Sequence, residues 1–293
     1  MSVTVPRTIW ILWQQGISDA PLVVRKCIAS WRRENPAWDI VLLDAANLHE
    51  YIDLQVPEDI LAKLSRAHQA DLARLALLSK YGGVWADATT YCLQPLDEWI
   101  DDSCRSGFFV FSKPSRDRLI SNWFMASTPG SPIVTSLYLR MSDYWVRNQF
   151  GKLNWLQKAC RKISSVILNR NISATRHWFN PIMTKVFRVY PYFVFHYMFA
   201  NMIATDSESS AIWKRTKKVS TDLPHLIQRA GMFSYPADSI KQQIEDGTAP
   251  LFKLRWQYDS DQYGPDTLLY YLLEQRQPKG RNGDTASVDF VTQ

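Results

Sequence analysis

An acidic and a basic residue lie three positions apart in a stretch with helical periodicity. Asp71 and Arg74 fall within residues 67–80, where apolar residues recur at the three- and four-residue spacing of a helix. Residues three apart share a helix face, so the carboxylate and the guanidinium can act on one ligand. The same spacing is common in surface ion pairs, which contribute little to stability. The spacing leaves both interpretations open.

A third candidate, Asp87, directly follows the apolar run at residues 84–86. The glycines at 82 and 83 predict the end of the preceding helix, because glycine adopts the left-handed cap conformation without steric cost. The apolar run predicts a buried strand, and open α/β sheets bind ligands at the carboxyl ends of their strands. A carboxylate there can hold a hard divalent cation, which in turn holds phosphate oxygens. The alternative is an aspartate that caps a turn.

These features belong to a longer pattern: D-L-x-R, then Y-G-G-V-W-x-D-A-T, then C-L-x-P-L-D. The pattern resembles the capsular polysaccharide synthesis family of sugar-nucleotide glycosyltransferases. That family is related to the DXD-type enzymes, which include yeast mannosyltransferases and glucosylating bacterial toxins. The resemblance covers the N-terminal part of the chain well and the rest loosely. It implies a hexosyltransferase that moves a sugar, with retention, from a UDP-sugar to a growing polysaccharide or lipid-linked glycan in capsule or surface polysaccharide synthesis.

By position, the resemblance implies that Asp71 and Arg74 bind hydroxyl groups of the donor sugar. It implies that Asp87 binds Mn²⁺ or Mg²⁺ together with the diphosphate. Thr89 stands where the second aspartate of the D-x-D pair is expected. Because threonine offers an oxygen but no charge, we expect a metal contact that is weaker, bridged by water or completed elsewhere in the chain.

Other parts of the chain supply further nucleotide-binding candidates. In the family the first strand ends beside the base, which implies that Trp13 stacks on uracil with Gln14 nearby; without the resemblance, core packing is the favoured interpretation of Trp13. Related transferases close over the diphosphate with a C-terminal lysine or tryptophan, which points to Lys253 and Trp256. A cation there would stabilise the charge on the departing nucleotide.

Four polar residues complete the set of candidates. Asn122, in the S-N-W-F run, is implied to face the sugar pocket, although asparagine also forms turns. His196, in Y-F-V-F-H-Y, is a candidate to bind the acceptor or the diphosphate, or else a hydrogen-bonded core residue. Asp259 and Asp261 could complete the metal site that Thr89 leaves short.

The order of predicted elements favours an α/β fold. Residues 7–13 and 40–44 are apolar runs typical of parallel strands, and an amphipathic helix at 21–33 separates them. With the helix and strand described above, this alternation predicts a single Rossmann-like, doubly wound sheet, and the resemblance implies the GT-A type. We expect one domain over residues 1–276, with a helical, basic insertion at about 144–189, and a loose tail at 277–293.

Composition indicates a globular protein. The chain has 293 residues, 46% hydrophobic and 21% charged, which excludes disordered and fibrous classes. The four cysteines lack C-x-x-C spacing and predict reduced, mostly buried thiols of a cytosolic protein. No stretch reads as a signal peptide or a membrane span. We therefore expect a cytoplasmic location, peripheral on the inner membrane face.

A long basic segment separates Asp143 from Asp206. It contains nine Lys and Arg residues and no acidic residue, and apolar residues such as Trp155 interleave with the cations. The net charge of the chain is +6, which favours anionic partners. An anionic membrane surface contacted by residues 147–188 fits this pattern and would suit a polyprenyl-linked glycan acceptor. A solvated basic insertion is the alternative, and nucleic acid is disfavoured because no nucleic-acid module accompanies the charge.

Two other functional classes remain open. A glycoside hydrolase could use Asp71 and Asp87 as its carboxylate pair. Against it, Arg74 is expected to depress the pKa of Asp71 and make it a poor acid. A non-catalytic carbohydrate- or membrane-binding protein that keeps the fold would explain the missing second aspartate.

Overall fold

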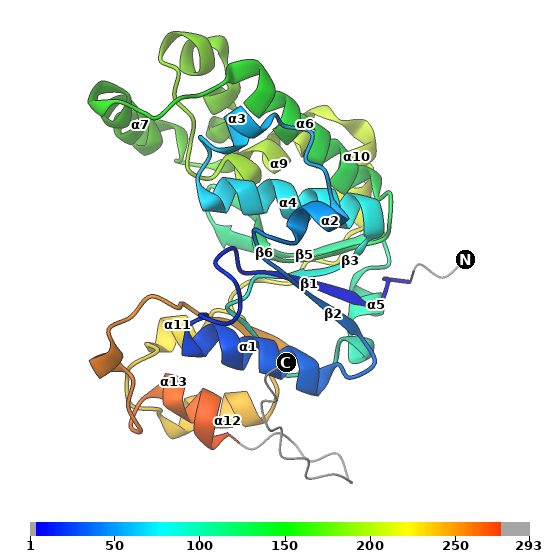
Figure 1. Ribbon diagram of the computed structural model, residues 1–293, viewed down its shortest axis with the longest axis vertical. Helices are drawn as coiled ribbons and strands as arrows, with labels where there is room; N and C mark the ends of the chain where they lie inside the picture. Colours follow the sequence, from blue (N-terminus) through cyan, green and yellow to red (C-terminus); the bar gives the residue numbers. More distant parts are fainter. Residues whose placement is uncertain (1–3, 277–293) are drawn as a thin grey trace.

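The protein is built on a five-stranded mixed sheet with helices on both faces (Figure 1). The computed structural model describes residues 4–276 of the chain. The strand order is β2-β1-β3-β6-β5. Strands β2, β1 and β3 are parallel, whereas β6 runs antiparallel to β3 and β5 antiparallel to β6. The tail predicted at 277–293 lies outside the described residues.

The elements have the following bounds. The large sheet contains β1 (Thr8–Leu12), β2 (Asp39–Leu43), β3 (Gly83–Ala86), β5 (Phe108–Ser115) and β6 (Arg118–Ser127); a second sheet pairs β4 (Thr90–Cys92) with β7 (Leu251–Lys253). The helices are α1 (Leu22–Glu34), α2 (Leu48–Tyr51), α3 (Glu58–Leu61), α4 (Arg66–Tyr81), α5 (Ile100–Ser103), α6 (Pro132–Asn148), α7 (Trp155–Leu168), α8 (Ile172–Thr175), α9 (Val194–Thr205), α10 (Ser207–Arg215), α11 (Leu226–Ala230), α12 (Asp238–Glu245) and α13 (Leu268–Tyr270). Short 3₁₀ or π turns are η1 (Leu96–Glu98), η2 (Arg176–Phe179), η3 (Ile182–Val186), η4 (Ser260–Gln262) and η5 (Tyr271–Gln275).

The central strand β1 is buried on both faces. Successive side chains of a strand point to opposite faces. Ile9 and Ile11 pack in the cluster that contains α1, whereas Trp10 and Leu12 pack in the cluster that contains α4 and α6. Figure 1 shows α1 on one side of the sheet and α4 on the other. Coverage of both faces explains why this strand reads as a continuous apolar run.

The α/β class predicted from the sequence is confirmed, and helices on both faces are consistent with the GT-A expectation. One part of the prediction needs correction: the sheet is doubly wound only over β1, β2 and β3. The β5–β6 hairpin adds two antiparallel strands. Both faces of strand β6 are covered, so buried and exposed residues hardly alternate along it. Its sequence therefore shows no alternation of apolar and polar residues.

The basic insertion is helical, as predicted. Helix α6 continues through Asn148, so the insertion proper begins after residue 148 and contains α7, α8, η2 and η3. It has a small core of its own, in which Trp178 and Met183 pack against Tyr197 of α9. Within residues 4–276, no helix is long and apolar enough to cross a bilayer.

The thiols also agree with the prediction. All four cysteines are unpaired, and Cys27, Cys92 and Cys104 are buried while Cys160 is partly exposed.

Two consecutive glycines make the passage from α4 into β3 possible. Gly82 and Gly83 both have positive φ, 66° and 88°. A Cβ on Gly82 would lie 2.7 Å from the ring of Pro129, and a Cβ on Gly83 would lie 2.6 Å from the carbonyl oxygen of Thr8 on β1. Both contacts are shorter than side chains tolerate, so the glycine pair of the Y-G-G-V-W motif is a packing requirement that places β3, and therefore Asp87, next to β1.

We predict that Gly83→Ala lowers the free energy of unfolding by about 2 kcal/mol or more, because the new Cβ adds a backbone clash to an unfavourable φ. Gly151→Ala is the matched control, since a Cβ there would meet no atom within 4 Å. Urea unfolding of the three proteins measures the difference. Equal midpoints for the two variants would contradict the steric argument.

Candidate functional site

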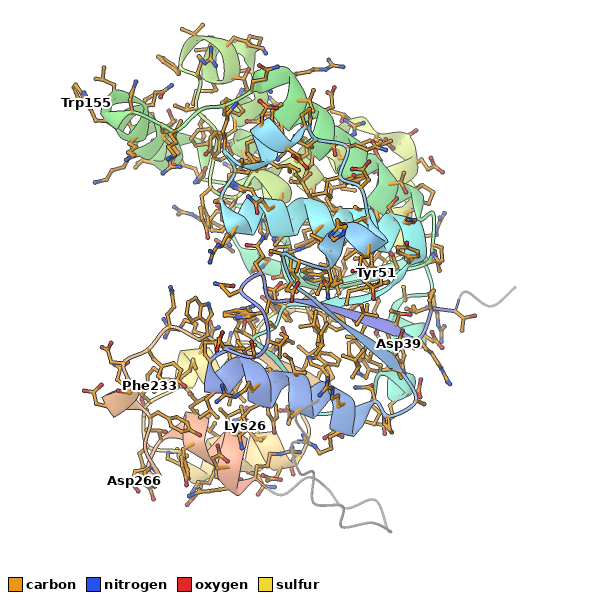
Figure 2. The ribbon with its side chains drawn as sticks, viewed as in Figure 1. Lys26, Asp39, Tyr51, Trp155, Phe233 and Asp266 are labelled. Carbon is orange, nitrogen blue, oxygen red and sulfur yellow. The ribbon has the colours of Figure 1, made fainter. Side chains whose placement is uncertain are left out.

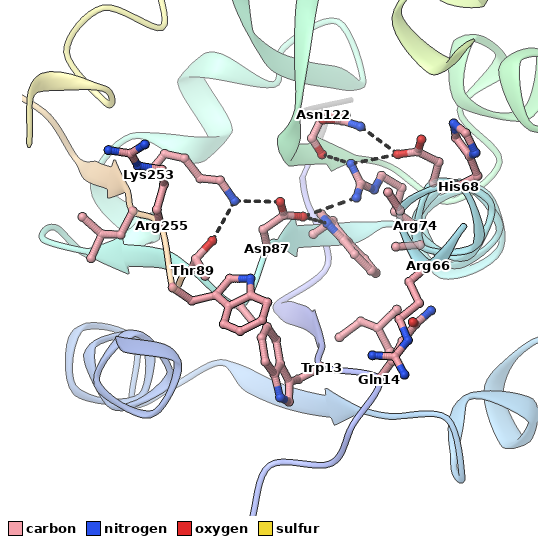
Figure 3. A pocket seen from close by; sticks show the side chains of 18 of the residues that line it. Trp13, Gln14, Arg66, His68, Arg74, Asp87, Thr89, Asn122, Lys253 and Arg255 are labelled. Atoms are coloured by element: carbon pink, nitrogen blue, oxygen red, sulfur yellow. Dashed lines mark hydrogen bonds and ion pairs between the residues drawn. The ribbon is translucent and has the colours of Figure 1, made fainter. Parts of the chain in front are cut away.

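A cavity of about 800 Å³ opens where β1 and β3 end (Figure 3). Small-molecule sites commonly have this size. Its walls come from the segment after β1, from α4, the β3–β4 turn, β6, the start of α9 and the segment around the end of β7. The residues predicted from the sequence that line it are Trp13, Gln14, Asp71, Arg74, Asp87, Thr89, Asn122, His196, Lys253 and Trp256.

Asp87 accepts hydrogen bonds from three donors on three segments of the chain. Its Oδ1 accepts from Arg74 Nη2 at 3.3 Å and from the indole Nε1 of Trp85 at 3.0 Å. Its Oδ2 accepts from Lys253 Nζ at 2.8 Å. Burial raises the pKa of Asp87, but the positive charges of Lys253 and Arg74 outweigh it, so the pKa lies below its usual range. Asp87 is therefore an anion whose two oxygens are both engaged.

The pairing of β4 with β7 brings Lys253 to this site from the far end of the chain. Thr90 lies opposite Lys253 in this ladder, and the backbone N–H of Leu254 donates to the carbonyl oxygen of Thr89 at 2.8 Å. The register places Lys253 Nζ 2.8 Å from Thr89 Oγ1 as well as from Asp87. Lys253 is thus fixed by regular backbone pairing and not by a free loop.

A second, buried network lies beside Asp87. Arg74 Nη1 donates to the backbone carbonyl of Asn122 at 2.6 Å and forms an ion pair with Asp71 Oδ1 at 3.3 Å. The Asn122 side chain donates to the same Asp71 oxygen at 2.7 Å. The guanidinium lies over the ring of Trp85, 5.0 Å from its centroid. Figure 3 shows that this chain of contacts joins α4, β6 and the end of β3 along one wall of the cavity.

The pKa of Asp71 shifts in the direction opposite to the one expected from the sequence. Burial raises the pKa of Asp71 above its ordinary value, and the positive charge of Arg74, which lowers it, does not offset this effect. The sequence spacing indicated that Arg74 lies near Asp71, but it did not indicate that Asp71 is buried. In the structure α4 is buried on nearly all sides.

His196 lies in the cavity wall, and its side chain is neutral. Burial, followed by the charges of Arg118 and Arg74, lowers its pKa to about 3. Its Nδ1 has no hydrogen-bond partner among the described residues, although the side chain is buried. A satisfied core histidine would have such a partner. His196 lines the cavity, but this nitrogen is itself inaccessible, so a ligand-binding role for His196 stays a prediction.

Two tryptophans line the same end of the cavity. The rings of Trp13 and Trp256 are perpendicular, with centroids 5.3 Å apart. Next to them, Gln14 Nε2 donates to Gln69 Oε1 at 3.3 Å. Trp13 is only half-buried, so it is not part of the closed core, and an aromatic ring of a ligand can reach it.

Two predicted residues are absent from the cavity, and several were missed. Asp259 and Asp261 do not line it; Asp259 instead forms a capping box at the start of η4 with Gln262. Sequence reasoning missed Arg66 and Arg255, two cations in the cavity wall, and the role of Trp85. Trp85 could have been found, because it is two residues from Asp87 on a strand and so points to the same face.

We predict that Arg74→Met destabilises the fold by about 3–5 kcal/mol, because it leaves a buried carboxylate without its cation. The Arg74 and Asp71 side chains are 5% and 8% exposed. The control Arg147→Met breaks an exposed ion pair with Asp143 and should cost less than about 1 kcal/mol. Thermal or urea unfolding gives both values, and similar losses in the two variants would argue against a buried charge network.

Comparisons with known proteins show which proteins the chain resembles. Residues 2–152 match the family model described as capsular polysaccharide synthesis protein. The chain is 29% identical over 152 residues to the O-glycosyltransferase braB of Annulohypoxylon truncatum, over 45% of this chain and 36% of that protein. It is 28% identical over 177 residues to the initiation-specific alpha-1,6-mannosyltransferase of Candida albicans, over 50% and 46%. The solved structure of PaToxG glycosyltransferase aligns over 72% of this chain and 74% of that one, with a TM-score of 0.41 and 14% identity.

The aligned region spans less than half the length of these two curated relatives. The family model, in contrast, covers more than half of the present chain and includes α4, β3 and the Asp71, Arg74 and Asp87 constellation. The chain belongs to the capsular polysaccharide synthesis protein family.

Proposed function

We propose that the protein is a glycosyltransferase that moves a sugar from a nucleotide donor, a UDP-sugar in the first instance, to a glycan. The observation that carries the proposal is the charged constellation of Asp71, Arg74, Asp87 and Lys253 in one cavity at the ends of β1 and β3. Open α/β sheets bind their ligands at this edge. The names of the curated relatives support the reaction class.

The cavity offers a separate surface for each part of a nucleotide-sugar. Four basic side chains line it against two acidic ones, an excess that favours a diphosphate; the basic ones are Arg66, Arg74, Lys253 and Arg255. The aromatic end with Trp13 and Trp256 suits the base. Asp71 and Asn122 are suited to bind sugar hydroxyls, because a carboxylate accepts and a carboxamide both donates and accepts.

The reaction needs stabilisation of the leaving group above all. The bond between the anomeric carbon and the diphosphate oxygen breaks, and its electron pair stays on the diphosphate. The acceptor hydroxyl forms the new bond and, in the retaining course that the family resemblance favours, passes its proton to the departing diphosphate on the same face. Cations that bind the diphosphate more strongly as this charge develops lower the barrier.

The hydrolase alternative is not favoured. A retaining glycosidase needs a carboxylate free to attack the sugar. The oxygens of Asp87 are already held by Arg74, Trp85 and Lys253. Asp71 is held by Asn122 and Arg74.

We propose in addition that the basic insertion docks on an anionic bilayer. Helix α7 has no buried residue. Trp155, Ile163 and Val166 are 75%, 64% and 70% exposed, and they recur at helical spacing on one face. Figure 2 shows Trp155 at the outer end of this helix, away from the body of the protein.

The cations of α7 and the extent of its exposed apolar face favour an anionic lipid surface as the partner that docks there. The cations of α7, Lys158, Arg161 and Lys162, line a shallow surface hollow with Val166. Val186, at the end of η3, and Phe187, which follows it, are also exposed. Gln157 Nε2 connects α7 to this segment by donating to the carbonyl of Phe187 at 3.3 Å. An apolar face bordered by cations is the pattern of an interfacial helix. Tyr192, which follows the insertion, lines the cavity, so a lipid-linked acceptor at the surface would lie near the donor.

For the transferase, we predict that Asp71→Asn lowers the rate of nucleotide release from the donor by at least about 100-fold, because the charged acceptor for the sugar hydroxyls is lost. The assay incubates purified protein with UDP-, GDP- and ADP-sugars and measures the release of the nucleoside diphosphate. Asp59→Asn, at an exposed surface pair, is the control and should keep the wild-type rate. Sugar release from a glycan without any nucleotide would favour the hydrolase, and donor binding without turnover the non-catalytic protein.

For membrane docking, we predict that the wild type floats with vesicles that contain phosphatidylglycerol and not with neutral phosphatidylcholine vesicles. The triple variant Lys158→Glu/Arg161→Glu/Lys162→Glu should lose at least roughly 3 kcal/mol of binding free energy and remain in the pellet fraction. The charge-matched control Arg32→Glu/Lys214→Glu/Arg215→Glu changes exposed cations elsewhere and should still float. Flotation of both triple variants, or of neither, would refute a docking role for α7.

A further inference from the structure

The residues at the position expected for a metal do not fit a divalent cation. Thr89 supplies a neutral hydroxyl where the family resemblance implies a second carboxylate, and hard cations are held mainly by carboxylate and carbonyl oxygens. Within residues 4–276, no three or more His, Cys, Asp or Glu side chains lie together in a way that could hold a metal ion. Asp259 and Asp261, the residues expected to complete the site, do not line the cavity.

A protein cation already lies between the two expected ligands. Lys253 Nζ is 2.8 Å from Asp87 Oδ2 and 2.8 Å from Thr89 Oγ1 (Figure 3). A metal ion that bound these two oxygens would have to displace the ammonium group. Displacement would also leave a lysine that is only 16% exposed without its partner, because β4–β7 pairing holds its backbone in place.

We infer that Lys253 takes the place of the divalent cation, so that the protein binds the diphosphate of its nucleotide without a metal. The inference rests on the proposed function, because it requires a diphosphate in this cavity. An ammonium group carries three N–H donors. Asp87 and Thr89 accept two of them, and the third has no acceptor within the described residues, so it is available to a phosphate oxygen.

Thr89 and Lys253 form a matched pair in this arrangement. With threonine at position 89, the cations Arg74 and Lys253 balance the carboxylates Asp71 and Asp87. An aspartate at position 89 would make this cluster net negative and favour an added cation instead. The threonine that departs from the D-x-D pattern is therefore the residue type that a lysine-based diphosphate site requires.

The test measures binding of UDP, GDP and ADP by calorimetry, in EDTA and in Mn²⁺, so that turnover is not needed. The wild type should bind at least one of them with the same affinity, within about threefold, in both solutions. Lys253→Met should weaken binding in EDTA by about 10- to 100-fold, the range expected for a charged hydrogen bond. The matched control Lys241→Met, at a surface pair with Asp238, should bind as the wild type does.

A reciprocal variant tests the role of Lys253 from the opposite direction, by restoring the conditions for metal binding. Thr89→Asp/Lys253→Met rebuilds an acidic pair without the lysine, and it should bind the nucleotide only when Mn²⁺ is present. Binding by the wild type in Mn²⁺ alone would overturn the inference and leave the proposed function intact. Unchanged affinity of folded Lys253→Met in EDTA would also overturn it. Absence of binding by the wild type in both solutions would contradict the proposed function and the inference together.

Discussion

The whole site depends on one partly buried anion, Asp87, held between Arg74 and Lys253. Arg74 lies on α4 and Asp87 directly follows β3, whereas Lys253 lies on β7, 166 residues after Asp87. Charges taken out of water are stable only when each has a partner of good geometry. The ion pairs therefore connect the N-terminal sheet with the C-terminal segment, and the cavity exists only where these parts meet.

The same constraint explains why the functional side chains lie on regular elements. Arg74 is fixed by the buried middle of helix α4, Asn122 by β6 and Lys253 by the β4–β7 ladder. Sites built on helices and strands hold their geometry more precisely than sites on loops. The parts of the cavity that we propose to contact a base or an acceptor, in contrast, come from the segments after β1 and β7 and from the start of α9. This division suits a reaction with a common diphosphate chemistry and a variable sugar or acceptor.

The sequence predicted the local features of the site and missed those that arise from long-range packing. The i,i+3 pair, the glycine stop and the aspartate after a strand are short-range patterns, and all lie where expected. Arg255 and the exact position of Lys253 depend on strand pairing between residues about 160 positions apart, a register that no local pattern encodes. The acidity of Asp71 was misjudged for a related reason, because burial is a property of the assembled core. Asp259 was misassigned because aspartate serves equally well as a cap.

A crystal structure of the protein with UDP and a non-transferable UDP-sugar would show where the nucleotide binds. The expected result places a diphosphate oxygen within hydrogen-bond distance of Lys253 Nζ, the base beside Trp13 and Trp256, and the sugar against Asp71 and Asn122. A nucleotide bound elsewhere on the protein, with the Asp87 and Lys253 side chains untouched by it, would contradict the central claim.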